Sequence, residues 1–269
     1  MIAARGPSKP RDAGRQSAAR SGSRVLPELG HIGPFTLYSF GLMAALGLII
    51  PAWFLAKDLS QRGLDPAFAY EILLAAGIGG FVGARLYYVA ENGTGDGLFS
   101  TSGLTWYGGL IGGIVAVSLL GRLRRKPLGI VANLVAPGVA LGQGIGRIGC
   151  QLAGDGDYGS KTSLPWGMSY PDGTVPTTEI VHPTPIYESA TLLVIFYVLW
   201  RLRGRLTGPW QLAGAYLAMA GTMRFLVEFV RRNPTEVAGL TTAQIISAVG
   251  VAVGAVLLAR GRGARAAVA

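Results

Sequence analysis

Five ionisable residues lie inside otherwise apolar segments of the sequence. They are three arginines and two glutamates, Arg85, Arg147, Arg224, Glu188 and Glu228. A charge at the middle of a membrane-spanning helix costs about 2.5–3.5 kcal/mol on insertion scales, so such a residue faces a polar cavity or a partner rather than lipid. Guanidinium groups bind phosphate in a bidentate way, and the excess of arginine favours an anionic ligand. Three guanidiniums at one depth suit a phospholipid headgroup.

Ion pairing is the alternative explanation for the same charges. Arg224 and Glu228 are four residues apart and therefore lie on one face of a helix, where they can pair. Arg85 and Glu188 form a second candidate pair, which would join two helices. In that case the five residues would lock helices together without forming a site.

The elements that carry these residues are long apolar segments. Half of the 269 residues are hydrophobic and only 14% are charged, which is typical of a protein whose solvent is lipid. Seven segments are long enough to be helices that cross a hydrocarbon core of roughly 30 Å. They span about residues 35–56, 66–90, 105–121, 127–149, 185–201, 208–230 and 240–259.

The sequence therefore predicts an all-α, polytopic membrane protein of about seven transmembrane helices. Its five intramembrane charges fall near helix ends on one side, which predicts a central polar cavity open toward the outer leaflet. Glycines spaced four apart predict close helix contacts. These glycine pairs are Gly79 and Gly83, Gly109 and Gly113, Gly142 and Gly146, and Gly250 and Gly254.

Composition divides the chain into three parts. Residues 1–33 are rich in Arg, Ser, Gly and Pro and are expected to form a disordered basic tail. Residues 34–262 form the membrane domain, which includes a long outer loop, 151–184, expected to cap the polar cavity. Residues 263–269 form a C-terminal tail.

The distribution of basic residues predicts the orientation. Loops 57–65, 122–126 and 201–207 and the C-terminus hold 12 Lys and Arg, whereas the loops on the other side hold only Lys161, Arg231 and Arg232. The positive-inside rule then places the C-terminus in the cytoplasm and the N-terminus outside, against the six cations of residues 1–33.

Several other classes of function are disfavoured. The net charge of +10 comes from short clusters between apolar segments, which is typical of membrane loops and not of a nucleic-acid-binding surface. One cysteine and two histidines make a metal centre improbable, and the acidic residues of loop 151–184 lack the ligand spacing of a calcium loop. We expect no metal, no cofactor and no nucleic-acid partner.

A signature and five further motifs, in chain order, resemble the prolipoprotein diacylglyceryl transferase family. The signature runs from Gly146-Arg147-Ile148-Gly149 to Gly159. The further motifs are Gly33-Pro34 through Gly41-Leu42-Met43, Gly83-Ala84-Arg85-Leu86-Tyr87-Tyr88, Trp106-Tyr107-Gly108-Gly109, His182-Pro183 to Tyr187-Glu188, and Arg224-Phe225 to Glu228-Phe229. Together they span about residues 31–232 on a matching seven-helix pattern.

This resemblance implies an enzyme of the bacterial inner membrane. Its substrates would be phosphatidylglycerol, which is a membrane lipid, and a prolipoprotein signal peptide with a lipobox cysteine. The diacylglyceryl group would move to the cysteine thiol, and glycerol phosphate would be released. Carried over by motif, the catalytic candidates are Arg147, Arg224, Tyr107 and Asp155, and the substrate-binding candidates are Arg85, Gly149, Cys150, Gly154, His182, Tyr187, Glu188 and Glu228.

Five positions depart from the pattern of the family that the chain resembles. Cys150 and Ala153 stand where Asn is expected, and Phe40 stands where a Tyr is expected. Asp155 replaces a Glu with one extra residue before Gly159, and Tyr107 replaces a His that is a candidate catalytic base. A phenol is a weak base at neutral pH but a competent hydrogen-bond donor, so Tyr107 is expected to orient rather than abstract a proton. A thiol with a pKa near 8.5 is partly ionised without a base.

Three further hypotheses stay open. The altered signature allows a related phospholipid-dependent transferase with another acceptor. A lipid-binding or transport protein is a second alternative, although no internal repeat is evident. Cys150, at a helix end beside Arg147, could also act as a nucleophile, against the commoner role of a buried packing residue.

Overall fold

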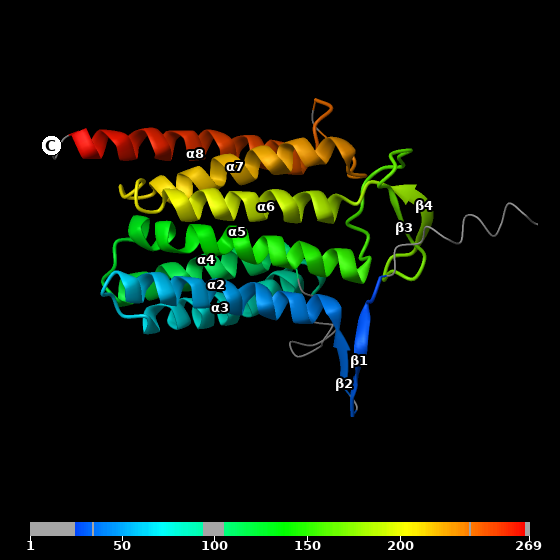
Figure 1. The fold of residues 1–269 in the computed structure, drawn as a ribbon, viewed down its shortest axis with the longest axis horizontal. Helices are drawn as coiled ribbons and strands as arrows, with labels where there is room; N and C mark the ends of the chain where they lie inside the picture. Colours follow the sequence, from blue (N-terminus) through cyan, green and yellow to red (C-terminus); the bar gives the residue numbers. More distant parts are fainter. Residues whose placement is uncertain (1–24, 34, 94–104, 237, 267–269) are drawn as a thin grey trace, which may run out of the picture.

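The structure is a bundle of long helices that run side by side. This computed structural model describes residues 25–33, 35–93, 105–236 and 238–266. Within these ranges lie seven α-helices, labelled in Figure 1. They are α2 (Ser39–Gln61), α3 (Ala67–Asn92), α4 (Trp106–Leu123), α5 (Leu128–Ala153), α6 (Thr184–Leu202), α7 (Gln211–Val227) and α8 (Thr242–Ala266), with a 3-10 turn η1 (Glu228–Val230) after α7.

Six of these helices are long and apolar enough to cross a membrane. The exception, α4, has 18 residues and is about 27 Å long at 1.5 Å per residue, close to the thickness of a hydrocarbon core. The chain is thus a multi-pass membrane protein, and the expected architecture is confirmed. Many large apolar side chains are exposed on the bundle, among them Ile78, Phe81 and Ile114, as a lipid-facing surface requires.

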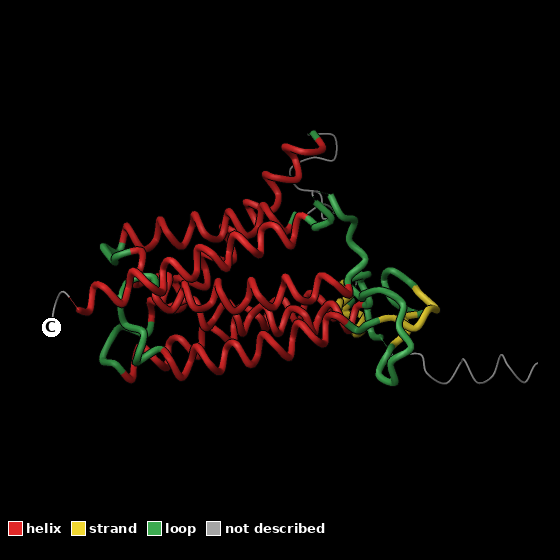
Figure 2. Tube along the Cα trace, turned by 90° about the horizontal axis from the view of Figure 1, so that it is seen from above, coloured by secondary structure: helices red, strands yellow, loops and turns green. Residues whose placement is uncertain are grey.

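Two small β-hairpins lie together at one end of the bundle (Figures 1 and 2). Strands β1 (Glu28–Ile32) and β2 (Phe35–Tyr38) pair before the first helix, and β3 (Met168–Tyr170) and β4 (Thr177–Val181) pair between α5 and α6. The sequence predicts disorder through residue 33 and a helix from residue 35. The structure differs at Glu28–Ile32 and Phe35–Tyr38, which are strands; residues 1–24 and 34 lie outside the described residues.

Glycine determines how closely the helices approach one another. A Cβ added to Gly83 of α3 would lie 2.7 Å from the Cα of Gly112 of α4, so these backbones are in direct contact. A Cβ on Gly47 of α2 would lie 2.9 Å from the carbonyl oxygen of Gly142 of α5. The predicted close contact is confirmed for Gly83 and Gly142, whereas Gly146 has no atom within 4 Å of an added Cβ.

The opposite end of the bundle carries the basic loops. The connections α2–α3, α4–α5 and α6–α7 and the C-terminus all lie at the end away from the hairpins (Figure 1). There the buried Asp58 carboxylate pairs with Arg62 at 2.9 Å and with Arg203 at 2.8 Å. The two ends of the molecule thus differ in charge as the sequence predicts.

Candidate functional site

A cluster of arginines and carboxylates lies at the hairpin end of the bundle. Arg147 comes from the last turns of α5, Glu188 from the first turns of α6, and Arg224 from the end of α7. Arg231 follows η1, and Asp157 belongs to the segment between α5 and β3. Five parts of the chain therefore contribute to one polar site.

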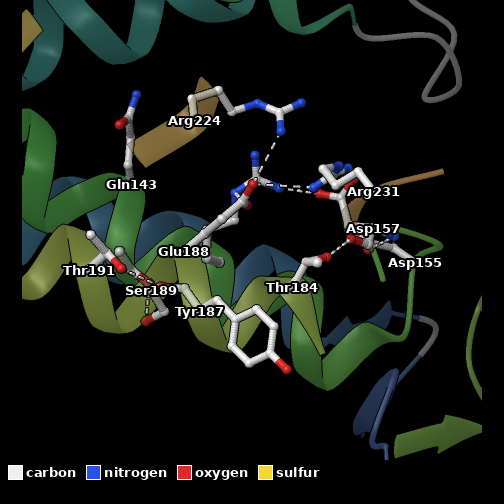
Figure 3. Close-up of polar contacts among 12 residues, drawn as sticks. Gln143, Asp155, Asp157, Thr184, Tyr187, Glu188, Ser189, Thr191, Arg224 and Arg231 are labelled. Carbon is white, nitrogen blue, oxygen red and sulfur yellow. Dashed lines mark hydrogen bonds and ion pairs between the residues drawn. The ribbon is translucent and has the colours of Figure 1, made fainter. Parts of the chain in front are cut away.

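Glu188 is the centre of this cluster. Its side chain is 1% exposed, and its Oε2 lies 2.6 Å from the Nε of Arg147. Its Oε1 lies 3.3 Å from Arg231 and 3.5 Å from Arg224. Figure 3 shows the side chains of Arg224 and Arg231 directed toward Glu188. One buried carboxylate is thus shared among three guanidinium groups.

Asp157 bridges two of the same arginines from the outer segment. Its Oδ1 lies 2.5 Å from Arg231, and its Oδ2 pairs with Arg147. The hydroxyl of Thr184 donates a hydrogen bond to the Asp157 backbone carbonyl and holds the residue over the start of α6. Burial by itself would raise the pKa of Asp157, but the guanidiniums of Arg147 and Arg231 outweigh burial and lower it.

Glu228 holds Arg224 on the other side of the cluster. The two residues pair at 2.5 Å across one helical turn, which confirms the pairing expected from their spacing. The second oxygen of Glu228 accepts hydrogen bonds from Asn233 at 2.6 Å and from Thr241 at 2.8 Å. The carboxylate is therefore fixed by two hydrogen bonds and one ion pair.

The exposed part of the cluster consists of two guanidiniums, those of Arg147 and Arg224, and one carboxylate, that of Asp157, which is 31% exposed. Arg147 and Arg224 keep 26% and 25% of their side chains exposed, whereas Glu188 and Glu228 keep 1% and 0%. The three arginines balance three carboxylates in formal charge, but two of those carboxylates are buried. An anion that reaches the cluster can therefore contact the exposed parts of Arg147 and Arg224, while Asp157 is the one exposed carboxylate of this cluster.

A cavity of about 350 Å³ opens beside Arg224. Its lining comprises Tyr107, Arg224, Glu228, Asn233, Pro234, Glu236, Thr241, Thr242 and Ala243. Tyr107, in the first turn of α4, is 48% exposed. Tyr107 and Arg224, two of the four catalytic candidates, thus line the same cavity. The cavity is large enough for a small polar group such as a headgroup.

Arg85 occupies a different environment from the one its sequence position predicts. It is buried on α3, with its guanidinium carbon 5.3 Å from the centre of the Tyr88 ring. Glu188, the partner expected for Arg85, forms its ion pairs with Arg147, Arg224 and Arg231. The expected interhelical lock between α3 and α6 is therefore replaced by a network among α5, α6 and α7.

Asp155 is not the carboxylate that orients Arg147; Asp157 is. Asp155 accepts a 3.3 Å hydrogen bond from the Asp157 N–H, and its burial, together with the nearby Asp157 charge, raises its pKa. The sulfur of Cys150 and oxygens of Asp155 and Asp157 lie within 4.8 Å of one another. Two guanidiniums already hold Asp157, however, and they would repel a metal cation.

The remaining candidates have structural contacts of their own. Gly149 packs against α2, where an added Cβ would lie 2.9 Å from that of Met43, and Gly154 ends α5 in a left-handed conformation with φ 58°. Tyr187 points away from the Glu188 cluster (Figure 3). Its hydroxyl accepts a 2.8 Å hydrogen bond from Trp166 and lies 3.4 Å from the Nδ1 of His182.

The sequence interpretation missed Arg231 and Asp157. Arg231 was counted among the outer-loop cations, yet its side chain is only 9% exposed. The signal was present in the spacing, because Arg224, Glu228 and Arg231 are separated by four and three residues, which in a continuous helix would place them on one face. In the structure the helix ends before Arg231, and the extended residue still directs its side chain to Glu188. No comparable signal marks Asp157, which follows Gly156 in a turn with φ +92°.

Comparison with known proteins supports one family. The family model of prolipoprotein diacylglyceryl transferase matches residues 27–260. The chain belongs to this family. Among curated relatives, a phosphatidylglycerol–prolipoprotein diacylglyceryl transferase of Clostridium tetani is 32% identical over 85% of this chain and 94% of its own length. One of the same name from Chromohalobacter salexigens is 36% identical over 75% of this chain and 77% of its own.

Two of the residues that depart from the motifs, Tyr107 and Cys150, can be located in the structure. Tyr107, which stands where the family pattern has His, still faces the cavity that Arg224 lines. Cys150, which stands where an Asn is expected, is buried at 8% exposure at the end of α5. In this member of the prolipoprotein diacylglyceryl transferase family, Tyr107 and Cys150 therefore lie close to the arginine cluster in the fold: Tyr107 lines the cavity beside Arg224, and Cys150 is three residues from Arg147 on α5.

Proposed function

We propose that this chain transfers the diacylglyceryl group of phosphatidylglycerol to the thiol of the lipobox cysteine in a prolipoprotein signal peptide. Glycerol phosphate is the second product. The observation that carries the proposal is that the partly exposed guanidiniums of Arg147 and Arg224 pair with the buried carboxylates of Glu188 and Glu228, and that Arg224 lines a cavity of about 350 Å³. The printed names of the relatives support the choice of donor and of acceptor protein.

The arginines stabilise the leaving group in this mechanism. The acceptor sulfur forms a bond to the terminal glyceryl carbon as the bond from that carbon to the phosphate oxygen breaks, and the thiol proton passes to solvent. The phosphodiester carries one negative charge, whereas the departing monoester carries about 1.5 to 2. Arg147 and Arg224 therefore bind the transition state more strongly than the substrate, which is the condition for rate acceleration.

Arg231 joins these two arginines because it shares both Glu188 and Asp157 with Arg147. Tyr107 provides a hydroxyl at the cavity wall, suited to donating a hydrogen bond to an oxygen of the donor lipid. The acceptor thiol supplies a few per cent thiolate at neutral pH, and nearby guanidiniums increase that fraction. No dedicated base is required.

The site operates at the outer leaflet of the bacterial inner membrane in this proposal. The basic loops lie at the end of the bundle opposite the cluster, and the positive-inside rule places them in the cytoplasm. The N-terminus is then outside and the C-terminus inside. A reporter that is active only in the cytoplasm, fused to the C-terminus, is expected to be active; activity of an extracytoplasmic reporter instead would reverse the orientation.

Substitution of Arg147 tests the proposed role of the cluster. We expect Arg147→Ala to reduce transfer of labelled diacylglyceryl from phosphatidylglycerol by about 100-fold or more. Arg147→Lys keeps the charge and loses the bidentate geometry, so its activity should be lower than that of the parent protein and higher than that of Arg147→Ala. Lys161→Ala, at an exposed cation near the same end, is the matched control. Full activity of a folded Arg147→Ala protein would refute the role.

A further inference from the structure

The Glu228 carboxylate is held from two directions. Its side chain is 0% exposed, and Oε2 faces the Nη1 of Arg224 at 2.5 Å. Oε1 accepts hydrogen bonds from the Asn233 amide at 2.6 Å and from the Thr241 hydroxyl at 2.8 Å. An ionised carboxylate only accepts hydrogen bonds, so both side chains must donate to it. Their direction fixes which oxygen remains for Arg224.

Thr241 performs a second task at the same time. Its hydroxyl oxygen accepts a 3.2 Å hydrogen bond from the Gln244 N–H, and its own N–H donates to the Gln244 side chain at 3.0 Å. This is a reciprocal capping box at the start of α8. Because the oxygen is used as the cap acceptor, the hydroxyl proton is free for Glu228. The first turn of α8 is thereby joined to the end of α7.

We propose that Thr241 and Asn233 are positioning residues for Arg224, acting through Glu228. The proposal rests on the proposed function for its kinetic readout. Arg224 approaches Glu188 only at 3.5 Å, whereas it approaches Glu228 at 2.5 Å. Glu228 therefore determines where the guanidinium lies, and Thr241 and Asn233 determine where Glu228 lies. All four residues line the same cavity.

The first experiment compares Thr241→Val with Thr241→Ser. Valine has nearly the same shape but no hydroxyl, and serine keeps the hydroxyl. We expect Thr241→Val to lower kcat for transfer by about tenfold, the loss of one hydrogen bond to a charged group, with a smaller change in KM for phosphatidylglycerol. Thr241→Ser should stay within about twofold of the parent. Equal losses in both variants would overturn the proposal.

Gln244→Met separates positioning from helix capping. It removes the acceptor of the Thr241 N–H and weakens the capping box, but it leaves the bond from Thr241 to Glu228 in place. We expect a lower melting temperature with kcat retained. If Gln244→Met lowers kcat as much as Thr241→Val does, Thr241 serves only to stabilise α8.

Asn233→Ala provides a second variant, at an exposed position, and its melting temperature is measured beside its activity. It should lower kcat severalfold, and it should have no further effect in an Arg224→Lys background, because both changes disrupt one chain of contacts. Additive losses would refute the coupling.

Binding of sn-glycerol phosphate, measured by the shift in melting temperature of the purified protein, supplies a readout that does not depend on transfer. The parent and Thr241→Ser should show the shift and Thr241→Val a smaller one. If the parent binds glycerol phosphate but transfers no lipid, the proposed function fails while the positioning role is still tested. An unchanged shift in Thr241→Val would overturn the positioning role.

Discussion

Glu188→Gln is the sharpest perturbation of the arginine cluster. The amide has nearly the same size as the carboxylate, so the change removes charge without opening a cavity. Three guanidiniums lie 2.6, 3.3 and 3.5 Å from the Glu188 oxygens. At an effective dielectric constant near 20, each contact contributes about 5 kcal/mol of gross attraction. After the substitution three cations face two carboxylates, Asp157 and Glu228.

Desolvation of the buried ions offsets most of that attraction, so the net effect is smaller than the gross sum. Breaking a buried ion pair from one side costs about 3–5 kcal/mol. At about 2–4 °C per kcal/mol for a chain of this size, the melting temperature in detergent should fall on the order of 10 °C. Transfer activity should fall by about 100-fold or more, because Arg147 and Arg224 lose their shared support.

Glu179→Gln is the matched control for Glu188→Gln. Glu179 also pairs with an arginine, Arg232 at 2.7 Å, but 51% of its side chain is exposed. An exposed pair contributes about 0–1 kcal/mol, so this variant should melt within about 3 °C of the parent and transfer lipid normally. If Glu188→Gln behaves like Glu179→Gln, the reasoning that places Glu188 at the centre of the site is refuted.

Three further predictions concern packing and charge. Cys150→Ser should leave transfer unchanged if the buried thiol only packs; loss of turnover with retained folding would make it a nucleophile. Gly83→Ala should lower the free energy of unfolding by about 1–3 kcal/mol, and with it the melting temperature, because its Cβ would lie 2.7 Å from the Gly112 Cα. Gly146→Ala should leave the melting temperature unchanged, because no atom lies within 4 Å of the added Cβ. The lowered pKa of Asp157 means that its ion pairs stabilise the fold above about pH 4 and are lost as pH falls further, so Asp157→Asn should flatten the acid limb of a melting-temperature profile.

Hydropathy predicts the helices well because a membrane-spanning segment must be long and apolar and must form its backbone hydrogen bonds within itself. The segment predicted at 127–149 corresponds to Leu128–Ala153, and that at 185–201 to Thr184–Leu202. The first helix begins at Ser39 rather than at residue 35, because Phe35–Tyr38 pairs as a strand. A short apolar run does not distinguish a strand from a helix start, and only the pairing partner decides.

The sequence predicts where the site lies better than it predicts which residues form it. The sequence predicts that five charges on four helices gather at one depth. Ion pairs join four of them, Arg147, Glu188, Arg224 and Glu228, whereas Arg85 is buried on α3 beside Tyr88. Which carboxylate reaches Arg147 depends on the path of the chain after α5. That path passes through Gly154 and Gly156, both with positive φ, so the direction of Asp155 and Asp157 cannot be read from the spacing.

The most direct test of the central claim is the acceptor reaction itself. Purified protein is incubated with phosphatidylglycerol labelled in the diacylglyceryl group and with two peptides, one containing a lipobox cysteine and one with serine in its place. The account predicts labelled thioether on the cysteine peptide, an equal amount of released glycerol phosphate, and no label on the serine peptide. Lipid that remains intact in the presence of the cysteine peptide, or label found on neither peptide while glycerol phosphate is released, would contradict it.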